Sequence, residues 1–304
     1  VNTSSAETIT DKVVDAGIPL VYINREPDEE EQKRWSDNNW DVTYVGCDAR
    51  QSGTFQGEII SDLGLDALDF NGNGKVDYIM VEGDPENVDA QYRTEFSVKA
   101  LEDAGLEVNC LSDQVGNWQQ DQAQQIVANA LGQFGNDVEV VFCNNDAMAL
   151  GALQAIESAG RTVGEDIYLV GVDALSEALE DVLAGTMTGT VFNDHFSQSH
   201  SAADAAINYL SGAGNEHYIG CDYVKVTKDN AQEILDAMND TDRATVDQII
   251  TNHMSADTMK EASSYITSGD TAGLKQFAKD TLTASELEQI KELYNKYKGQ
   301  VSMK

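Results

Sequence analysis

Short apolar runs alternate with amphipathic helical stretches along most of this chain. Runs such as Val76–Val81, Val138–Cys143 and Ile167–Val172 are typical of buried strands. Between such runs, stretches such as Asp121–Phe134 and Ala147–Gly160 place apolar residues at helical spacing. Parallel strands need long crossover connections, usually helices, so this order predicts an α/β fold with doubly wound parallel sheets covered on both faces. Further strands are expected at 18–23, 42–45, 106–111 and 188–192, and further helices at 4–17, 52–63, 89–105, 176–184 and 197–211.

Polar side chains follow several of these predicted strands. In open α/β sheets, ligands bind beyond the carboxyl ends of the strands, so we expect these side chains to converge on one crevice. Such residues can also cap the helices that follow, and this alternative applies to each of them singly. Several in register together with an arginine favour a polar pocket for a polyhydroxylated ligand. These candidates are Asn87, Asp89, Arg93, Asn145, Asp173 and Asn193.

Trp118 lies in the polar stretch GNWQQDQ, outside any apolar periodicity. An indole ring in such a place suits stacking on the apolar C–H face of a sugar ring. The alternative is a loop tryptophan folded onto the core, and the sequence leaves both interpretations open.

Residues 69–77, with the sequence DFNGNGKVD, have the spacing of a calcium loop. Oxygen-bearing side chains fall at loop positions 1, 3, 5 and 9, a glycine stands at position 6, and position 7 offers a backbone carbonyl. Position 12 should be a glutamate but is Met80, so either a carboxylate elsewhere completes the site or the segment is only a polar turn. The loop residues expected to bind Ca²⁺ are Asp69, Asn71, Asn73, Lys75 through its carbonyl, and Asp77.

The chain carries a formal net charge of −34. Such a surface repels phosphate backbones and anionic membranes, which argues against nucleic-acid or membrane-surface partners. The acidic excess lies before residue 240, whereas charges of both signs nearly balance in 241–304, so a boundary is expected near residue 240. No apolar run approaches the length needed to span a bilayer, so no membrane insertion is expected.

Motifs of the common enzyme classes are missing from the sequence. It has no GxGxxG after a strand, no GxxxxGK[ST], no GxSxG and no HExxH, and its four histidines form no metal-ligand cluster. The four cysteines show no CxxC spacing, and we interpret them as small buried hydrophobic residues rather than disulfides or metal ligands. The sequence therefore predicts a binding protein rather than an enzyme.

Several longer segments carry a resemblance to a known family. They are IPLVYINREP, YVGCDARQSGTFQGEII, DFNGNGKVDYIMVEGDPENVDAQYRT, VEVVFCNNDAMALGALQAIESAG, VGVDALSEAL and AGTMTGTVFND. From about residue 1 to 230 the chain resembles the periplasmic galactose/glucose-binding proteins. The resemblance implies a two-lobed periplasmic-binding-protein type 1 fold that binds a galactose- or glucose-like monosaccharide in an interlobe cleft. It also implies a periplasmic or cell-surface location, where a lipid anchor could attach the protein to the membrane. The resemblance further implies that the protein delivers its sugar to the membrane component of an ABC transporter, and that a chemoreceptor is a second kind of partner.

The resemblance also assigns roles to individual residues. The family's sugar contacts fall on Asp89, Arg93, Asn145, Asp173 and Asn193, and its stacking tryptophan falls on Trp118. A sugar-contact histidine of the family is Asn87 here, which leaves the preferred sugar open. The family completes its calcium loop with a glutamate on a neighbouring strand, and the matching residue is Glu139.

The resemblance begins inside the family's first lobe. VNTSSAETIT matches a segment there, so we expect the family's opening βα units to be missing, with an acidic contact, an asparagine contact and the opposing aromatic. Residues 241–304 match nothing in the family and read as a helical tail of unknown role: helices at 242–253, 256–267, 271–281 and 285–297, the last behind a Thr283–Glu286 capping box. The expected domains are an incomplete first lobe (1–23 and 193–223), a second lobe with the calcium loop (24–192 and 224–240) and the tail (241–304).

Two other functions stay open on sequence grounds. The same fold serves as the sugar-sensing domain of LacI-type transcription regulators, but those need a basic helix-turn-helix, and no such segment is present in this chain. A Rossmann-type enzyme is opposed by the missing phosphate-binding glycine loop.

Overall fold

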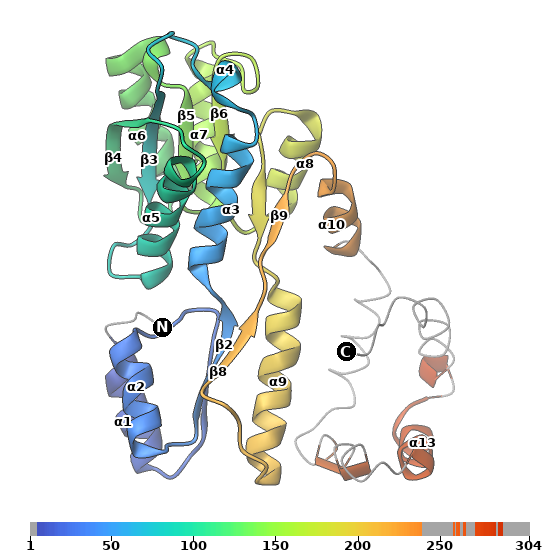
Figure 1. The fold of residues 1–304 in the computed structure, drawn as a ribbon. Helices are drawn as coiled ribbons and strands as arrows, with labels where there is room; N and C mark the ends of the chain where they lie inside the picture. Colours follow the sequence, from blue (N-terminus) through green and yellow to red (C-terminus); the bar gives the residue numbers. More distant parts are fainter. Residues whose placement is uncertain are drawn as a thin grey trace. The chain divides into compact units, whose positions relative to one another are not determined.

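The computed structural model describes residues 5–238, 258, 260–261, 264–265, 271–283 and 285–287 (Figure 1). The chain divides into two compact units. One comprises Val1–Ala205 and Asn215–Leu235, and the other Ala206–Gly214 and Asp236–Lys304. All the strands and the candidate site described below belong to the first unit, which contains two parallel sheets. The predicted α/β fold with parallel sheets is confirmed.

The first sheet has three parallel strands in the order β1-β2-β8. Its strands are β1 (Leu20–Ile23), β2 (Val42–Cys47) and β8 (Tyr218–Cys221), and the helices α1 (Ala6–Asp15) and α2 (Glu29–Asn38) accompany it. Tyr22 and Trp35 stack with ring centroids 5.5 Å apart inside an apolar cluster that also holds Val42 and Tyr44. The sheet is therefore held to its helices by buried aromatic side chains.

The position of β2 corrects the predicted domain boundary. We expected residue 24 to begin the second lobe, but β2 pairs with β1 on one side and β8 on the other. All six residues of β2 are buried, as a strand flanked on both sides should be. The first sheet therefore continues to Cys47.

The second sheet has four parallel strands in the order β4-β3-β5-β6. They are β4 (Val108–Val115), β3 (Val76–Glu82), β5 (Val140–Cys143) and β6 (Tyr168–Val170). The surrounding helical segments are α3 (Ala49–Ser61), α4 (Leu65–Leu68), α5 (Val88–Asp103), α6 (Gln120–Phe134), η2 (Gly135–Asp137), α7 (Asp146–Ser158) and α8 (Ser176–Ala184).

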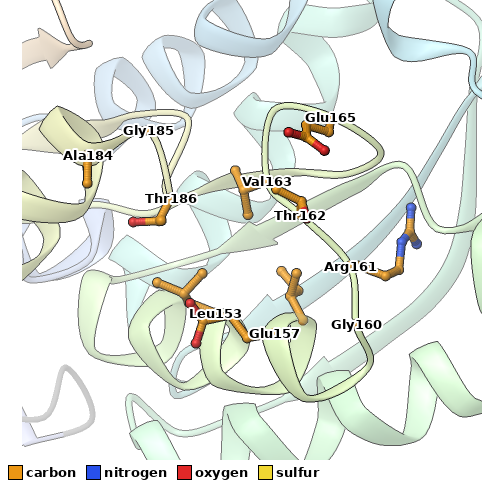
Figure 2. A pocket seen from close by; sticks show the side chains of 11 residues that line it. Leu153, Glu157, Gly160, Arg161, Thr162, Val163, Glu165, Ala184, Gly185 and Thr186 are labelled. Atoms are coloured by element: carbon orange, nitrogen blue, oxygen red, sulfur yellow. The ribbon is translucent and has the colours of Figure 1, made fainter.

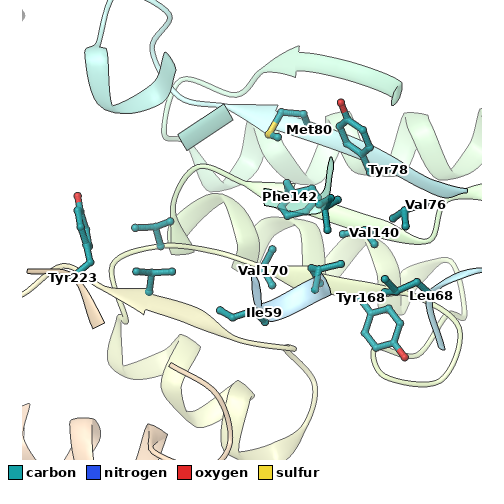
Figure 3. Close-up of a cluster of buried hydrophobic side chains, with 14 of the residues drawn as sticks. Ile59, Leu68, Val76, Tyr78, Met80, Val140, Phe142, Tyr168, Val170 and Tyr223 are labelled. Carbon is teal, nitrogen blue, oxygen red and sulfur yellow. The ribbon is translucent and has the colours of Figure 1, made fainter. Parts of the chain in front are cut away.

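Alternate residues of these strands face opposite layers of helices. Tyr78 and Met80 share a buried cluster with Phe142, Ile59 of α3 and Leu101 of α5 (Figure 3). Because side chains alternate along a strand, the intervening residues face the other side, where α6 and α7 pack on one another and on β3 and β5. The sheet is thus buried on both faces, as the continuous apolar strands predicted.

Three segments carry the chain between the two sheets. The first runs from β2 into α3. The second runs from β7 (Thr190–Phe192) into α9 (His195–Ser211), and the third from β8 into β9 (Val224–Val226) and α10 (Ala231–Met238). β7 and β9 pair with each other as an antiparallel ribbon. Two of the three crossing segments, those that contain β7 and β9, therefore lie side by side between the sheets.

Part of the predicted tail lies within the described residues. α13 spans Thr271–Thr281, as expected. The predicted capping box is confirmed, because the Thr283 N–H donates to Glu286 Oε2 (2.8 Å) and the Glu286 N–H donates to Thr283 Oγ1 (3.3 Å). The helix expected at 242–253 lies outside the described residues, and those at 256–267 and 285–297 are described only in part. None of the helices described is both long and apolar enough to cross a membrane.

Candidate functional site

A polar cavity of about 140 Å³ collects all seven of the residues predicted to contact a sugar. They come from segments that follow β3, β4, β5, β6 and β7, and residues that follow β1 close the cavity from the first sheet. The site therefore stands at the carboxyl ends of parallel strands, where the fold class places ligands. Its lining consists of Asn24, Arg25, Asn87, Asp89, Arg93, Trp118, Asn145, Asp173 and Asn193.

Two of these residues both cap a helix and line the cavity. The Asn87 side chain accepts a hydrogen bond from the Asp89 N–H (2.9 Å) at the start of α5, and Asn145 accepts one from the Met148 N–H (3.0 Å) at the start of α7. Each cap uses the side-chain oxygen and leaves the amide N–H groups for other partners. Capping and pocket lining, which the sequence posed as alternatives, hold together at both positions.

Arg93 on α5 is 4 % exposed and is fixed by several acceptors. Its Nη1 donates to the Asn144 carbonyl (2.8 Å), its Nη2 donates to the Tyr223 hydroxyl (3.1 Å), and Nη1 lies 3.8 Å from Asp173 Oδ1. Burial opposes its charge, but Tyr223, Asp173 and Asp89 raise the pKa of Arg93 above its usual value. Its buried Nε has no partner among the described residues, so one donor is left over.

Asp89 and Asp173 bring two carboxylates to the same cavity. Burial raises the pKa of both. The largest opposing effect comes from Arg93 in each case, followed by Arg25 at Asp89 and by Asn193 at Asp173. Asp89 Oδ1 is buried and has no partner among the described residues, so it can accept a hydrogen bond from a ligand. Asp173 has a φ of 120°, and backbone strain of this kind at a non-glycine residue is concentrated at ligand sites.

Trp118 lies against the backbone of Gly83, at the carboxyl end of β3. A Cβ atom built on Gly83 would stand 2.2 Å from the nearest ring atoms, so only glycine leaves room for the indole. Trp118 itself has a φ of 65°, and the Arg93 guanidinium carbon lies 5.8 Å from the ring centroid. The ring therefore packs on the fold, as one of the two interpretations predicted, and also lines the cavity; stacking on a sugar stays a prediction.

Asn24 and Arg25 line the cavity but were missed in the sequence. Both directly follow β1, and Asn24 Oδ1 accepts a hydrogen bond from Asn193 Nδ2 (3.1 Å) across the cavity. Their position after a strand is the same signal that marked the other lining residues. Asn24 is thus an asparagine that lines the cavity from the first-sheet side, additional to the contact expected in the family's opening βα units, on which the structure does not bear.

The predicted calcium loop is a tight turn whose polar groups bond to one another. Asp69 accepts from the backbone N–H groups of Asn73 and Gly74 (both 2.9 Å), and the amides of Asn71 and Asn73 donate to Asp77 Oδ2 (2.7 and 2.6 Å). Gly74 has a φ of 81°, which the turn requires. The Lys75 ammonium points away, toward Glu107 at 3.5 Å.

Glu139 reaches this loop from the residue just before β5. Its carboxylate accepts from the Asp77 N–H (2.9 Å) and the Asn71 N–H (3.2 Å), although it is far away in sequence. Glu139 and Asp77 are 0 % and 2 % exposed, and burial, with a smaller contribution from Asp77, raises the pKa of Glu139. The described residues place no cationic side chain on this buried acidic pair. Within them, no group of three or more His, Cys, Asp or Glu side chains is placed to hold a metal, so a cation here would also need the Asn oxygens and the Lys75 carbonyl.

A second hollow, of about 570 Å³, lies in the second-sheet part of the molecule (Figure 2). It is lined by the end of α7, the loop 160–165 and the end of α8. Arg161 borders it, but its guanidinium donates to the carbonyl oxygens of Gly135 (3.1 Å) and Val138 (2.7 Å), which accounts for its burial. None of the predicted site residues lies here.

Comparison with known sequences gives one family match and several relatives. A family described as the periplasmic binding protein domain matches residues 1–216. The D-galactose/methyl-galactoside binding periplasmic protein MglB of Haemophilus influenzae is 32% identical over 247 residues, 77% of this chain and 72% of its own length. A putative rhizopine-binding protein of Rhizobium meliloti is 34% identical over 239 residues, 77% of this chain and 71% of its own length.

Solved structures share the same architecture. An ABC transporter solute binding protein from Bacillus halodurans with bound myo-inositol superposes with a TM-score of 0.66 at 27% identity and covers 77% of this chain and 74% of its own. A periplasmic solute binding protein from Actinobacillus succinogenes with bound D-allose gives a TM-score of 0.63 at 23% identity, over 74% of this chain and 75% of its own.

Proposed function

The chain belongs to the periplasmic binding protein family, and from this premise we propose that it is the sugar-binding component of an ABC transporter. Relatives are described as binding D-galactose or methyl-galactoside, xylitol and D-allose. The family is extracytoplasmic, so the protein works outside the cytoplasm. It is a solute-binding protein and not an enzyme.

The ligand we propose is a galactose- or glucose-like monosaccharide in the 140 Å³ cavity. The observation that carries this proposal is the convergence of two carboxylates, two arginines, four asparagines and one tryptophan on a single small cavity. Hydroxyl groups of a sugar can donate to Asp89 and Asp173 and accept from Arg93, while an apolar ring face lies on Trp118. Charge-assisted bonds also give selectivity, because an epimer that leaves a buried charge unpaired loses more than a neutral contact would cost.

Delivery of the sugar to the transporter would depend on how the two parts of the protein form the cavity. Asn24 and Arg25 come from the first sheet, whereas Asp89, Arg93 and Asn145 come from the second. Three crossing segments join these two parts, so a ligand that bonds to both parts favours the closed arrangement. The closed, loaded form is the one we propose the membrane component of the transporter recognises, with a chemoreceptor as a second partner.

We also propose a structural Ca²⁺ held by the loop 69–77 and Glu139. A hard cation ligated by oxygen would neutralise the buried Asp77–Glu139 pair and tie the turn to the sheet. The ligands would be Asp69, Asn71, Asn73, the Lys75 carbonyl, Asp77 and Glu139. Turning the Asn71 and Asn73 amides would present their oxygens to the ion in place of the N–H groups that now face Asp77.

The sugar proposal is tested by two substitutions that spare the fold. Asp89→Asn keeps the shape of the side chain but removes its charge, and Asn145→Ser keeps a good helix cap while removing the amide. Each should weaken binding by about 1–3 kcal/mol, or about ten- to hundredfold, because a buried polar partner is lost. The measurement is titration calorimetry with D-galactose, D-glucose, D-allose and myo-inositol.

The matched control is Asp28→Asn. Asp28 caps α2 by accepting from the Glu31 N–H (2.8 Å), and it does not line the cavity. This variant should bind sugar as the wild type does. Unchanged affinity in both cavity variants for a sugar that the wild type binds would move the site elsewhere, and failure of the wild type to bind any of the four would reject the proposed ligand class.

A further inference from the structure

Cys47 and Cys221 stand opposite each other at the ends of neighbouring strands. The register of β2 and β8 pairs Tyr44 with Tyr218 and runs to Cys47 with Cys221 as its last pair. Paired residues of parallel strands point to the same face of the sheet. In agreement, Cys47 belongs to the buried cluster that contains Phe142, and the partly buried Cys221 packs against that cluster.

The spacing of the two residues suits a covalent bond. Neighbouring strands lie about 4.7–4.9 Å apart, and disulfide-bonded residues usually have Cα atoms about 4.4–6.8 Å apart. Burial, and next the neighbouring Cys221 thiol, raise the pKa of Cys47 to about 12, so the two side chains interact electrostatically. Cys221 Sγ lies 4.0 Å from Ser201 Oγ, so only a weak contact would be given up when that sulfur turns.

The other two cysteines provide a contrast inside the same chain. Cys110 of β4 is exposed and pairs with Tyr78, and Cys143 of β5 is buried and pairs with Val81. The exposure of Cys110 also corrects the interpretation of all four cysteines as buried hydrophobic residues. Neither has a cysteine as its strand partner.

We propose that Cys47 and Cys221 form an intramolecular disulfide when the protein meets an external disulfide as oxidant. The more accessible Cys221 thiolate attacks one sulfur of that disulfide and releases a thiol, leaving a mixed disulfide. The Cys47 thiolate then attacks Cys221 Sγ and releases the second thiol. The two protein thiols lose two electrons and two protons, and the external disulfide gains them as two thiols. Such oxidants are abundant outside the cytoplasm, so this step rests on the proposed location and not on the identity of the ligand.

The bond would join two of the three crossing segments. Cys47 is followed by Asp48, which caps α3, and Cys221 is followed by Asp222 and Tyr223. The Tyr223 N–H donates to Gln51 Oε1 (2.6 Å), and the Tyr223 hydroxyl accepts from Arg93 of the cavity. The disulfide would therefore link the ends of β2 and β8. The second of these ends leads directly to Tyr223, which holds Arg93 in place.

Peptide mapping after thiol alkylation tests the proposal without any ligand. The full chain is refolded with glutathione disulfide, denatured without reductant, alkylated and digested. The expected result is a linked Cys47–Cys221 peptide pair, with Cys110 and Cys143 alkylated, and alkylation of all four cysteines when reductant is added first. Labelling of all four cysteines in the oxidised sample, or a link that involves Cys110 or Cys143 instead, would overturn the proposal.

Thermal unfolding supplies a second measurement. Reductant should lower the melting temperature of the oxidised wild type, because the bond constrains the unfolded chain. Cys221→Ser, at the less buried of the two positions, should show no such dependence, whereas Cys110→Ser should keep it. Equal responses of these two variants would contradict the assignment. Sugar binding plays no part in either readout, so failure here is separate from failure of the proposed function.

Discussion

Replacing Gly83 with alanine is expected to weaken sugar binding without unfolding the protein. The backbone of Gly83 has no positive φ, so an alanine can adopt its conformation. The added Cβ would nevertheless stand 2.2 Å from two carbon atoms of the Trp118 ring, far inside the usual carbon contact distance of about 3.5–4 Å. The indole must therefore move by about 1 Å or more. This displacement takes the ring away from the position in which it lines the cavity.

The size of the effect follows from what the ring contributes. Aromatic stacking on an apolar face is worth about 0.5–1.5 kcal/mol beyond area burial. The contact of the ring with the Arg93 guanidinium, 5.8 Å from its centroid, is made without sugar, so its loss lowers the stability of the fold and does not directly lower the affinity. The stacking contribution alone predicts a loss of about 0.5–1.5 kcal/mol, or about two- to tenfold in Kd. Titration calorimetry with the tightest-binding sugar of the panel measures it.

Gly132→Ala is the matched control. Gly132 lies in α6, has no positive φ, and no atom stands within 4 Å of a Cβ built there. The substitution should leave the affinity unchanged and raise the stability by up to about 1 kcal/mol, because alanine favours helix over glycine.

A double variant separates displacement of the ring from other effects. If Gly83→Ala acts through the indole, it should cost little further affinity in a Trp118→Ala background, so the two changes are strongly non-additive. Wild-type affinity in Gly83→Ala, or full additivity in the double variant, would refute the reasoning.

Two further predictions concern the buried acidic groups. Chelation with EGTA should lower the melting temperature in differential scanning calorimetry, since an ion bound only to the folded state stabilises it by mass action, and Glu139→Gln should reduce that response. An identical melting curve with EGTA, together with no calcium in an elemental assay, would reject the calcium proposal. Burial, and next Asp173, raise the pKa of Asp146 to about 7, against about 4 in the unfolded chain. The folded state binds this proton more tightly, so its contribution to the free energy of unfolding falls as pH rises from about 4 to about 7. Asp146→Asn should flatten that part of the curve in urea denaturation, and an unchanged slope would count against the assignment.

The cavity could be predicted because its residues obey a local rule. Asn87, Asn145, Asp173 and Asn193 each follow a strand, and the carboxyl ends of parallel strands meet at one edge. Asn24 obeys the same rule after β1, although it was not among the predicted contacts. The geometry that makes the site small, such as the packing of Trp118 on Gly83, has no local signature.

Helix α2 shows where the apolar pattern is insufficient. Its sequence EEEQKRWSDN has one large apolar residue, so no helical period is visible. The helix is held instead by that residue, Trp35, which stacks on Tyr22 and donates from Nε1 to Glu31 Oε1 (2.7 Å). An Asp28 cap and an ion pair between Arg34 and Glu31 add to it. Tertiary contacts, not periodicity, decide this element.

The pairing of β2 with β8 was invisible for a different reason. Tyr44 and Tyr218 are direct partners but lie far apart in the chain, and nothing near either residue indicates the other. Strand patterns predict which segments are strands, whereas the order within a sheet depends on contacts between distant segments.

The same long-range pairing sets the order in which the molecule can assemble. The second sheet draws its strands from one uninterrupted stretch, from Val76 to Val170, so it can form as soon as that stretch has left the ribosome or the export channel. The first sheet must wait for Tyr218–Cys221 before the free side of β2 is covered. Until then, a strand whose six residues are all buried in the folded protein presents open backbone groups to any other chain nearby. Closing this last edge is therefore the step at which folding competes with aggregation, and crowding of newly made chains should penalise it most.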